Sequence, residues 1–137
     1  MILPEIAHSS NPLIMKERML TDSEAQRFAS EWITAWNSHD LDAILFHYDE
    51  RVALTSPVAA RLLNDPSGTV RGKGALCEYF RRGLEAYPNL RFELLDVMFG
   101  MSSIVLCYKN QKSTKTAEFM EFGESGKIIR VVANYSG

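Results

Sequence analysis

The sequence has 137 residues, of which 46% are hydrophobic and 23% are charged. This length and composition are those of one globular domain, and they exclude a wholly disordered chain. A formal net charge of −2 argues against a nucleic-acid-binding protein, because such proteins present a basic face.

The N-terminal stretch, residues 1–20, contains prolines and glutamates and lacks the basic start and apolar core of a signal peptide. We interpret it as an arm that packs on the domain, residues 21–137, or on a partner subunit. No apolar run is long enough to span a membrane, so no membrane partner is expected. Cys77 and Cys107 lie in apolar segments without motif spacing, which indicates buried, reduced thiols and a cytoplasmic protein.

The first predicted helix follows Thr21, because Thr21 and Glu24 have the spacing of a capping box. Apolar residues then recur with a period of 3.6 residues, which predicts an amphipathic helix over residues 22–37. The residues of this stripe are Ala25, Phe28, Ala29, Trp32, Ile33 and Trp36. Asp40 is the expected N-cap of a second, short helix over residues 41–48.

The middle of the chain begins with a predicted strand over residues 52–56, where a proline stops a short apolar run. Residues 58–68 are predicted to be a connection that ends in a turn. Its apolar residues either cover the mouth of a pocket as a lid or pack on the core. A short strand over residues 69–71 and a third helix that ends before Pro88 complete this part.

From residue 90 onward the apolar residues follow the period of strands. Strands are predicted over residues 90–99, 103–109, 114–122 and 127–135, with short polar turns between them. Short turns join neighbouring antiparallel strands, so these segments should form a meander. Helices followed by an antiparallel sheet indicate an α+β domain.

Several short motifs also occur in a characteristic order. They are Trp36-Asn37-Ser38-His39-Asp40-Leu41-Asp42, His47-Tyr48-Asp49-Glu50, Val70-Arg71-Gly72-Lys73-Gly74-Ala75-Leu76 and Gly126-Lys127-Ile128. Over about residues 21–135 this order resembles the nuclear transport factor 2-like superfamily, in particular its SnoaL-like and ketosteroid isomerase-like members. The resemblance implies a cystatin-like cone, in which three N-terminal helices pack in a strongly curved antiparallel (mixed) sheet around an apolar pocket. It also implies a homodimer across the outer face of the sheet, which would include Arg130 and Val132.

The ketosteroid isomerases of this fold use an aspartate base and an oxyanion hole made by a tyrosine and a protonated carboxylic acid. The resemblance places Ser56 at the base, Trp32 at the tyrosine and Glu118 at the protonated acid. A serine hydroxyl does not shuttle a proton between carbons at neutral pH, so isomerisation of a 3-ketosteroid by that route is not expected. Trp32 and a neutral Glu118 can still donate hydrogen bonds to a carbonyl group in an apolar pocket.

Glu118 and His47 are the candidate catalytic residues. Glu118 is either a pocket acid or an outward carboxylate beside an inward Phe119. His47, at the end of the second predicted helix, is either a general base or a satisfied polar residue. The candidate ligand-binding residues are Trp32, Trp36, Tyr48, Ser56, Phe80, Tyr108, Met120, Val131 and Tyr135.

No motif predicts a metal or a cofactor. Asp40 is already used as an N-cap beside His39 and Asp42, and Gly72-Lys73-Gly74 lacks the spacing of a phosphate-binding loop. Because the fold hosts enzymes, binding proteins and scaffolds, two functions stay open. The first is cofactor-free acid–base chemistry of isomerase, cyclase or lyase type on a small hydrophobic carbonyl compound. The second is a non-catalytic module that binds a small ligand or another protein.

Overall fold

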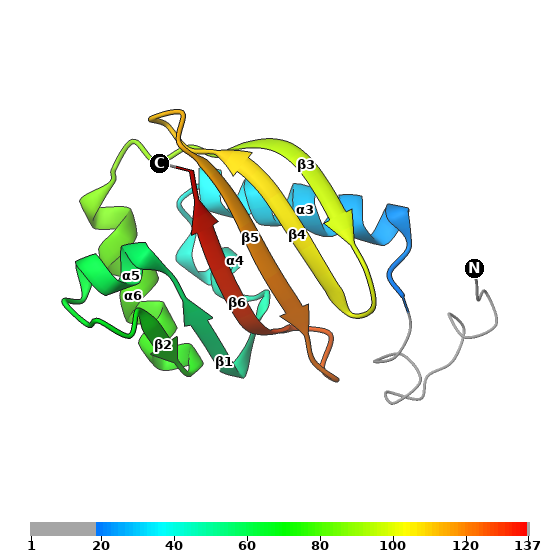
Figure 1. Cartoon of the computed structure of the whole chain (residues 1–137), viewed down its shortest axis with the longest axis horizontal. Coiled ribbons are helices and arrows are strands. Elements are labelled where there is room, and N and C mark those ends of the chain that lie inside the picture. Colours follow the sequence, from blue (N-terminus) through cyan, green and yellow to red (C-terminus); the bar gives the residue numbers. More distant parts are fainter. Residues whose placement is uncertain (1–18, 137) are drawn as a thin grey trace.

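The structure is a computed structural model that describes residues 19–136 (Figure 1). Its helices are α3 (Asp22–Asn37), α4 (Leu41–Leu45), α5 (Pro57–Leu62) and α6 (Lys73–Ala86). Its strands are β1 (Tyr48–Thr55), β2 (Thr69–Arg71), β3 (Glu93–Phe99), β4 (Ser103–Lys109), β5 (Lys115–Phe122) and β6 (Ile128–Tyr135). Of the predicted N-terminal arm, residues 1–18 lie outside the described residues. Met19 forms an isolated bridge with Met101 at the β3–β4 turn.

The strands form one curved, open sheet in the order β2-β1-β6-β5-β4-β3. Strands β3 to β6 pair as the predicted antiparallel meander. Strand β1 joins the free edge of β6 in parallel, with Leu54 opposite Val131, and β2 pairs antiparallel with β1. The sheet is therefore mixed, and the α+β fold class predicted from the sequence is confirmed.

Helix α3 lies behind the meander and supplies the centre of the core (Figure 1). The predicted capping box is present: the Glu24 N–H donates to Thr21 Oγ1 at 3.1 Å, and the Thr21 N–H donates to Glu24 Oε1 at 2.9 Å. The predicted apolar stripe explains the packing, because its buried members, with Trp32 only 1% exposed, face the sheet.

The strand predicted over residues 90–99 begins at Glu93, and two other parts of the chain differ more from the prediction. The second helix ends at Leu45 rather than Tyr48, and Tyr48 begins β1 instead. Residues 58–68 are not one irregular connection, because α5 occupies residues 57–62. A proline that stops a strand also fits the first position of a helix, and the Ser56 Oγ before it accepts from the Val58 N–H at 3.1 Å. The described residues thus contain four helices rather than three.

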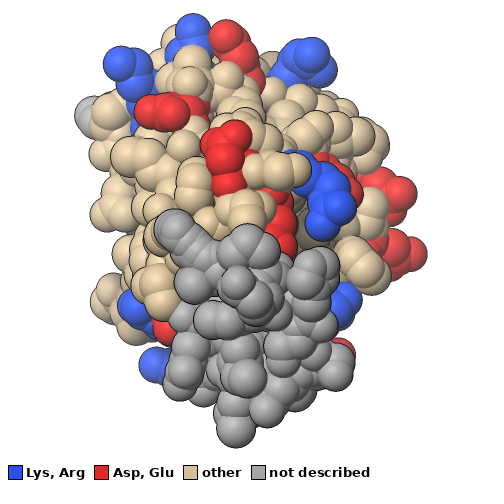
Figure 2. All heavy atoms as spheres, turned by 90° about the vertical axis from the view of Figure 1, so that its right-hand side faces the viewer, with Lys and Arg blue, Asp and Glu red and all other residues tan. Residues whose placement is uncertain are grey.

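The surface is mixed in charge. On the face shown in Figure 2, acidic and basic side chains are scattered among uncharged ones. No helix in the described part of the chain is long and apolar enough to cross a membrane. Cys77 and Cys107 are free thiols, but both are half-buried rather than buried as predicted. Cys107 is half-buried because it lies on the outer face of β4, opposite Ala117.

Candidate functional site

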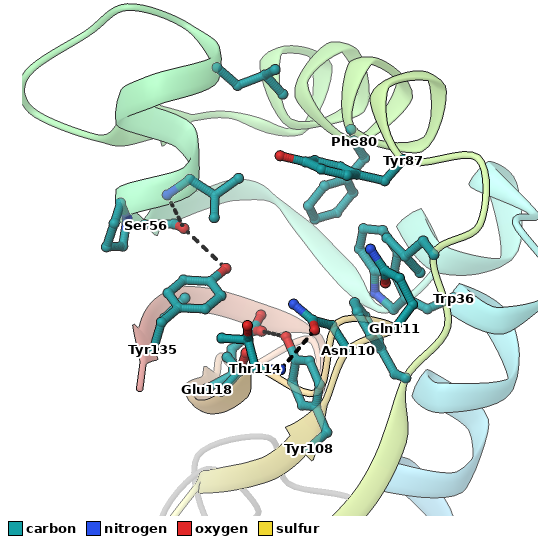
Figure 3. Close-up of a pocket in the computed structure, with 18 of the residues that line it drawn as sticks. Trp36, Ser56, Phe80, Tyr87, Tyr108, Asn110, Gln111, Thr114, Glu118 and Tyr135 are labelled. Carbon is teal, nitrogen blue, oxygen red and sulfur yellow. Dashed lines mark hydrogen bonds between the residues drawn. The ribbon is translucent and has the colours of Figure 1, made fainter. Parts of the chain in front are cut away.

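A cavity of about 340 Å³ lies between the concave face of the sheet and helices α3, α5 and α6 (Figure 3). Eight of its 23 lining residues are aromatic, and its volume falls at the small end of the range for sites that bind organic molecules. In Figure 3, Glu118 and Tyr135 lie on the sheet side of the cavity, and Phe80 and Tyr87 lie across from them.

Glu118 points into this cavity, because the inward residues of β5 are Thr116, Glu118 and Met120. Phe119 lies on the opposite face. The Glu118 side chain is 6% exposed, and its Oε1 accepts a hydrogen bond from the Tyr108 hydroxyl at 2.5 Å. Burial disfavours the carboxylate and raises the pKa of Glu118 to about 7, although the bond from Tyr108 acts in the opposite direction. Glu118 is therefore present in both protonation states near neutral pH.

Tyr108 reaches Glu118 from the neighbouring strand β4, where it pairs with Thr116. Burial and the nearby charge of Glu118 raise the pKa of Tyr108 well above its usual value. The phenol stays protonated at neutral pH, so its O–H is a permanent donor. This donor holds one oxygen of Glu118 and leaves the other for a ligand.

A second polar pair lies at the end of β1 and β6. The Ser56 Oγ and the Tyr135 hydroxyl are 3.4 Å apart, and either atom can donate. Burial, followed by the charge of Glu118, raises the pKa of Tyr135 to about 12. Ser56 is held in place because its Oγ caps α5 and its N–H donates to the Gly68 carbonyl at 2.9 Å. Gly68 itself has a φ of +61°, and a Cβ there would lie 2.8 Å from the Ser56 carbonyl oxygen.

The two tryptophans of α3 differ in their hydrogen bonding. The Trp32 indole N–H donates to the Tyr48 hydroxyl at 3.0 Å. Both indoles favour the ionised form of Tyr48, but burial outweighs them and holds its pKa well above the usual value. Trp36 Nε1 is buried and has no hydrogen-bond partner among the described residues. Because this N–H still acts on Tyr48, it lies near the Tyr48 hydroxyl with imperfect geometry rather than open to the cavity.

The structure brings most of the predicted site residues together. Those that line the cavity are Trp32, Trp36, Ser56, Phe80, Tyr108, Glu118 and Tyr135. The predicted residues Tyr48, Met120 and Val131 do not line it, because they are fully buried in the core beneath it. Burial depth along a strand depends on packing between distant segments, which alternation alone does not reveal.

His47 also lies outside the cavity lining. Its ring packs against Phe28 and Phe46, with centroids 5.4 and 5.7 Å apart. Burial lowers the pKa of His47, with the charge of Glu31 opposing and that of Lys127 adding to the effect. The imidazole is therefore neutral at pH 7, in a cluster apart from Glu118.

Sequence reasoning missed several lining residues, namely Arg61, Tyr79, Tyr87, Asn110, Gln111, Lys112 and Thr114. In the sequence, apolar residues recur at the spacing of one helix face before Pro88, and Tyr79 and Tyr87 are among them, so their period contained a usable signal. The turn at residues 110–114 had none, because a polar hairpin turn is normally a surface feature. Within residues 19–136, no group of three or more His, Cys, Asp or Glu side chains is arranged to hold a metal ion.

Comparisons with known proteins agree with this fold. The model of the SnoaL-like domain family matches residues 29–131, whereas none of the curated proteins matches the sequence. A SnoaL-like protein of unknown function from Burkholderia thailandensis is 37% identical, with a TM-score of 0.84 over 88% of this chain and 100% of that chain. A protein of unknown function with a cystatin-like fold from Methylobium petroleophilum is 15% identical, with a TM-score of 0.69 over 88% and 80% of the two chains. The epoxide hydrolase/cyclase-like enzyme SalBIII, described for its role in pyran ring formation in the polyether salinomycin, is 17% identical, with a TM-score of 0.64 over 84% and 92%.

Proposed function

This chain belongs to the SnoaL-like domain family, and we propose that it is an enzyme of cofactor-free acid–base chemistry. The reaction is of isomerase, cyclase or lyase type, and the substrate is a small hydrophobic carbonyl compound. The observation that carries the proposal is Glu118, a buried carboxyl group that faces an aromatic cavity with a pKa of about 7. General acid–base catalysis is most effective when the pKa of the catalytic group lies near the working pH.

In this proposal three side chains have separate roles. The Glu118 carboxylate takes a proton from the carbon next to the substrate carbonyl, and the electrons of the C–H bond form an enolate. The Tyr135 hydroxyl, which lines the cavity and stays protonated at neutral pH, donates a hydrogen bond to the enolate oxygen and stabilises its charge. The Tyr108 hydroxyl orients Glu118 throughout.

The protonated Glu118 then returns its proton. Delivery to a different carbon completes an isomerisation. Alternatively, the enolate carbon attacks a second carbonyl carbon of the same substrate and closes a ring. Glu118 then protonates the resulting alkoxide. SalBIII, which has a similar fold, is described for its role in pyran ring formation, so a ring closure of another kind is associated with this architecture.

The test is α-proton exchange of small aromatic ketones such as 1-tetralone in D₂O, followed by proton NMR. The wild type should exchange these protons faster than buffer, and Glu118→Gln should lose about 10²–10⁴-fold of that rate. Glu121→Gln is the matched control, because Glu121 lies on the same strand but pairs with Arg130 outside the cavity. Exchange by Glu118→Gln at the wild-type rate would remove Glu118 from the mechanism.

A second candidate function is non-catalytic binding of the same class of ligand. It is favoured by Ser56, which the family resemblance places at the base of the ketosteroid isomerases and whose oxygen caps α5. Under this alternative the cavity binds a ketone, Glu118→Gln binds it as well as the wild type, and neither protein exchanges its protons.

We also propose that the partner of this chain is a second copy of itself, bound through the outer face of the sheet. Outward residues at matching register form a continuous apolar line across four strands, here called the outer row: Met98, Val105, Phe119 and Val132. Met98 is 51% exposed, and the other three are half-buried. An exposed apolar stripe of this kind favours association.

A further inference from the structure

The charge of the cavity lining is opposite in sign to that of the whole chain. Among the lining residues Arg61 and Lys112 are basic, and Glu118 is the single acidic one. Glu118 lies at the inner end and is buried, whereas Arg61 and Lys112 are exposed and therefore belong to the mouth. The chain as a whole carries a formal net charge of −2. A cationic mouth on a slightly acidic protein is a local feature that composition does not explain.

Lys112 is held at the mouth by a preorganised turn. The Asn110 side-chain oxygen accepts from the backbone N–H groups of Lys112 and Thr114, at 2.9 and 3.0 Å. The Gln111 side-chain oxygen accepts from the Arg91 N–H at 3.3 Å, which ties the turn to the segment before β3. The Lys112 ammonium lies 5.5 Å from the centre of the Tyr87 ring. The turn therefore keeps this charge beside the aromatic wall.

Arg61 comes from α5, which lies across the cavity from this turn (Figure 3). The helix is fixed at its start by the Ser56 cap and at its end by Arg82, whose guanidinium donates to the Leu62 carbonyl at 3.1 Å. The positive charge of Arg61 reaches the Tyr135 hydroxyl, where it acts to lower the pKa of that group. Neither Arg61 nor Lys112 forms an ion pair within residues 19–136.

We propose that the ligand of this cavity is an amphipathic organic anion, whose apolar ring system fills the aromatic part and whose anionic group lies at the mouth beside Arg61 and Lys112. The inference rests on the proposed function, because it takes the cavity to be the substrate site. Two unpaired cations near an apolar wall attract an anion more strongly than exposed charges do in bulk water. The ionised form of Glu118 repels an anionic group from the inner end. The ligand therefore enters with its neutral carbonyl group toward Glu118 and its anionic group outward.

The experiment uses probes that share one ring system and differ in charge: 2-naphthoate, neutral 2-naphthamide and 2-naphthyl phosphate. Binding is measured by isothermal titration calorimetry. Quenching of tryptophan emission places the probe, because the chain has 2 tryptophans and both Trp32 and Trp36 line the cavity. Wild-type protein should bind 2-naphthoate about tenfold more tightly than 2-naphthamide, a preference that weakens as salt is added. The phosphate probe tells whether a carboxylate or a phosphate fits the mouth better.

The double variant Arg61→Gln/Lys112→Gln should lose the preference for 2-naphthoate and bind 2-naphthamide within about twofold of the wild type. Arg81→Gln is the control, because Arg81 is exposed on α6 and pairs with Glu78 and Glu85. Equal binding of the charged and neutral probes, or a preference that survives in the double variant, overturns the anion inference and leaves the proposed chemistry standing. Failure of every probe to bind in the cavity overturns both.

Discussion

The two faces of the β3–β6 sheet are built by the same alternating strands and carry different chemistry. On β5, Glu118 faces inward, where it is buried and held by Tyr108. The next residue, Phe119, faces outward in the outer row, and Glu121 on that face pairs with Arg130 in a half-exposed ion pair. This sheet thus places its buried carboxyl group where no cation of residues 19–136 pairs with it, and its ion pair where solvent already screens it. A fold optimised only for stability would do the reverse.

The largest effect on stability is expected from Glu118, through pH. Its folded pKa of about 7 exceeds its ordinary value of 4.5, so the unfolded chain ionises first as the pH rises. The native state is therefore penalised increasingly between pH 4.5 and pH 7, and the full penalty persists above pH 7. A difference of about 2.5 pH units at about 1.4 kcal/mol each corresponds to about 3–4 kcal/mol.

Glu118→Gln removes this penalty, because a neutral amide replaces the carboxyl group while its oxygen still accepts from Tyr108. The free energy of unfolding, measured in urea at pH 4 and pH 8, should show a gain of the variant over the wild type that is larger at pH 8. Glu121→Gln, on the outer face of the same strand, should change the free energy of unfolding by less than about 1 kcal/mol at both pH values. If the Glu118→Gln gain is the same at pH 4 and pH 8, the inner carboxyl group is not desolvated and the contrast between the faces is lost.

The helix and strands that form the two faces of the sheet follow from sequence patterns, but the face on which Glu118 lies does not. The capping box at Thr21 and the 3.6-residue period predicted α3 with its bounds, and the alternation after residue 90 predicted the meander. Alternation left open which face Glu118 occupies. The register of the sheet shows which face Glu118 occupies. Glu118 pairs with Leu106 and Ala133, and all three residues face inward and are buried. The face of the sheet that turns inward is the one that packs against α3, and α3 is distant from β5 in the sequence.

The middle of the chain was less predictable for a local reason. Ser56-Pro57 is compatible both with the end of a strand and with the start of a helix. The prediction of a connection over residues 58–68 rests on the strand end alone. The position of Arg61 at the cavity mouth follows from α5 and was therefore missed as well.

The outer row should control the oligomeric state. Sedimentation of the wild type at micromolar concentration should give about twice 15.5 kDa, and Val132→Lys should give a monomer, because a buried lysine without a partner opposes association. The cavity should be unaffected, since Val131 and Ala133 face inward on either side of Val132. Glu85→Gln adds the same unit of charge on α6 and should leave the dimer intact. A wild type that sediments as a monomer would show that the outer row has no partner of this kind.

The smallest effect is expected at Ser56, where the cavity meets the end of β1. Its Oγ caps α5 by accepting from the Val58 N–H and lies 3.4 Å from the Tyr135 hydroxyl. Ser56→Ala removes the cap and should lower the free energy of unfolding by about 1 kcal/mol, whereas Ser56→Thr keeps a capping oxygen and should lose less. Proton exchange catalysed by the alanine variant should stay within about tenfold of the wild type, because Glu118 and not Ser56 moves the proton, and the residual loss should come from a displaced α5. Urea unfolding and the 1-tetralone assay on the same samples separate the two effects. An exchange rate as low as that of Glu118→Gln, at nearly wild-type stability, would make Ser56 part of the proton-transfer machinery and would move the chemical centre from β5 to the end of β1.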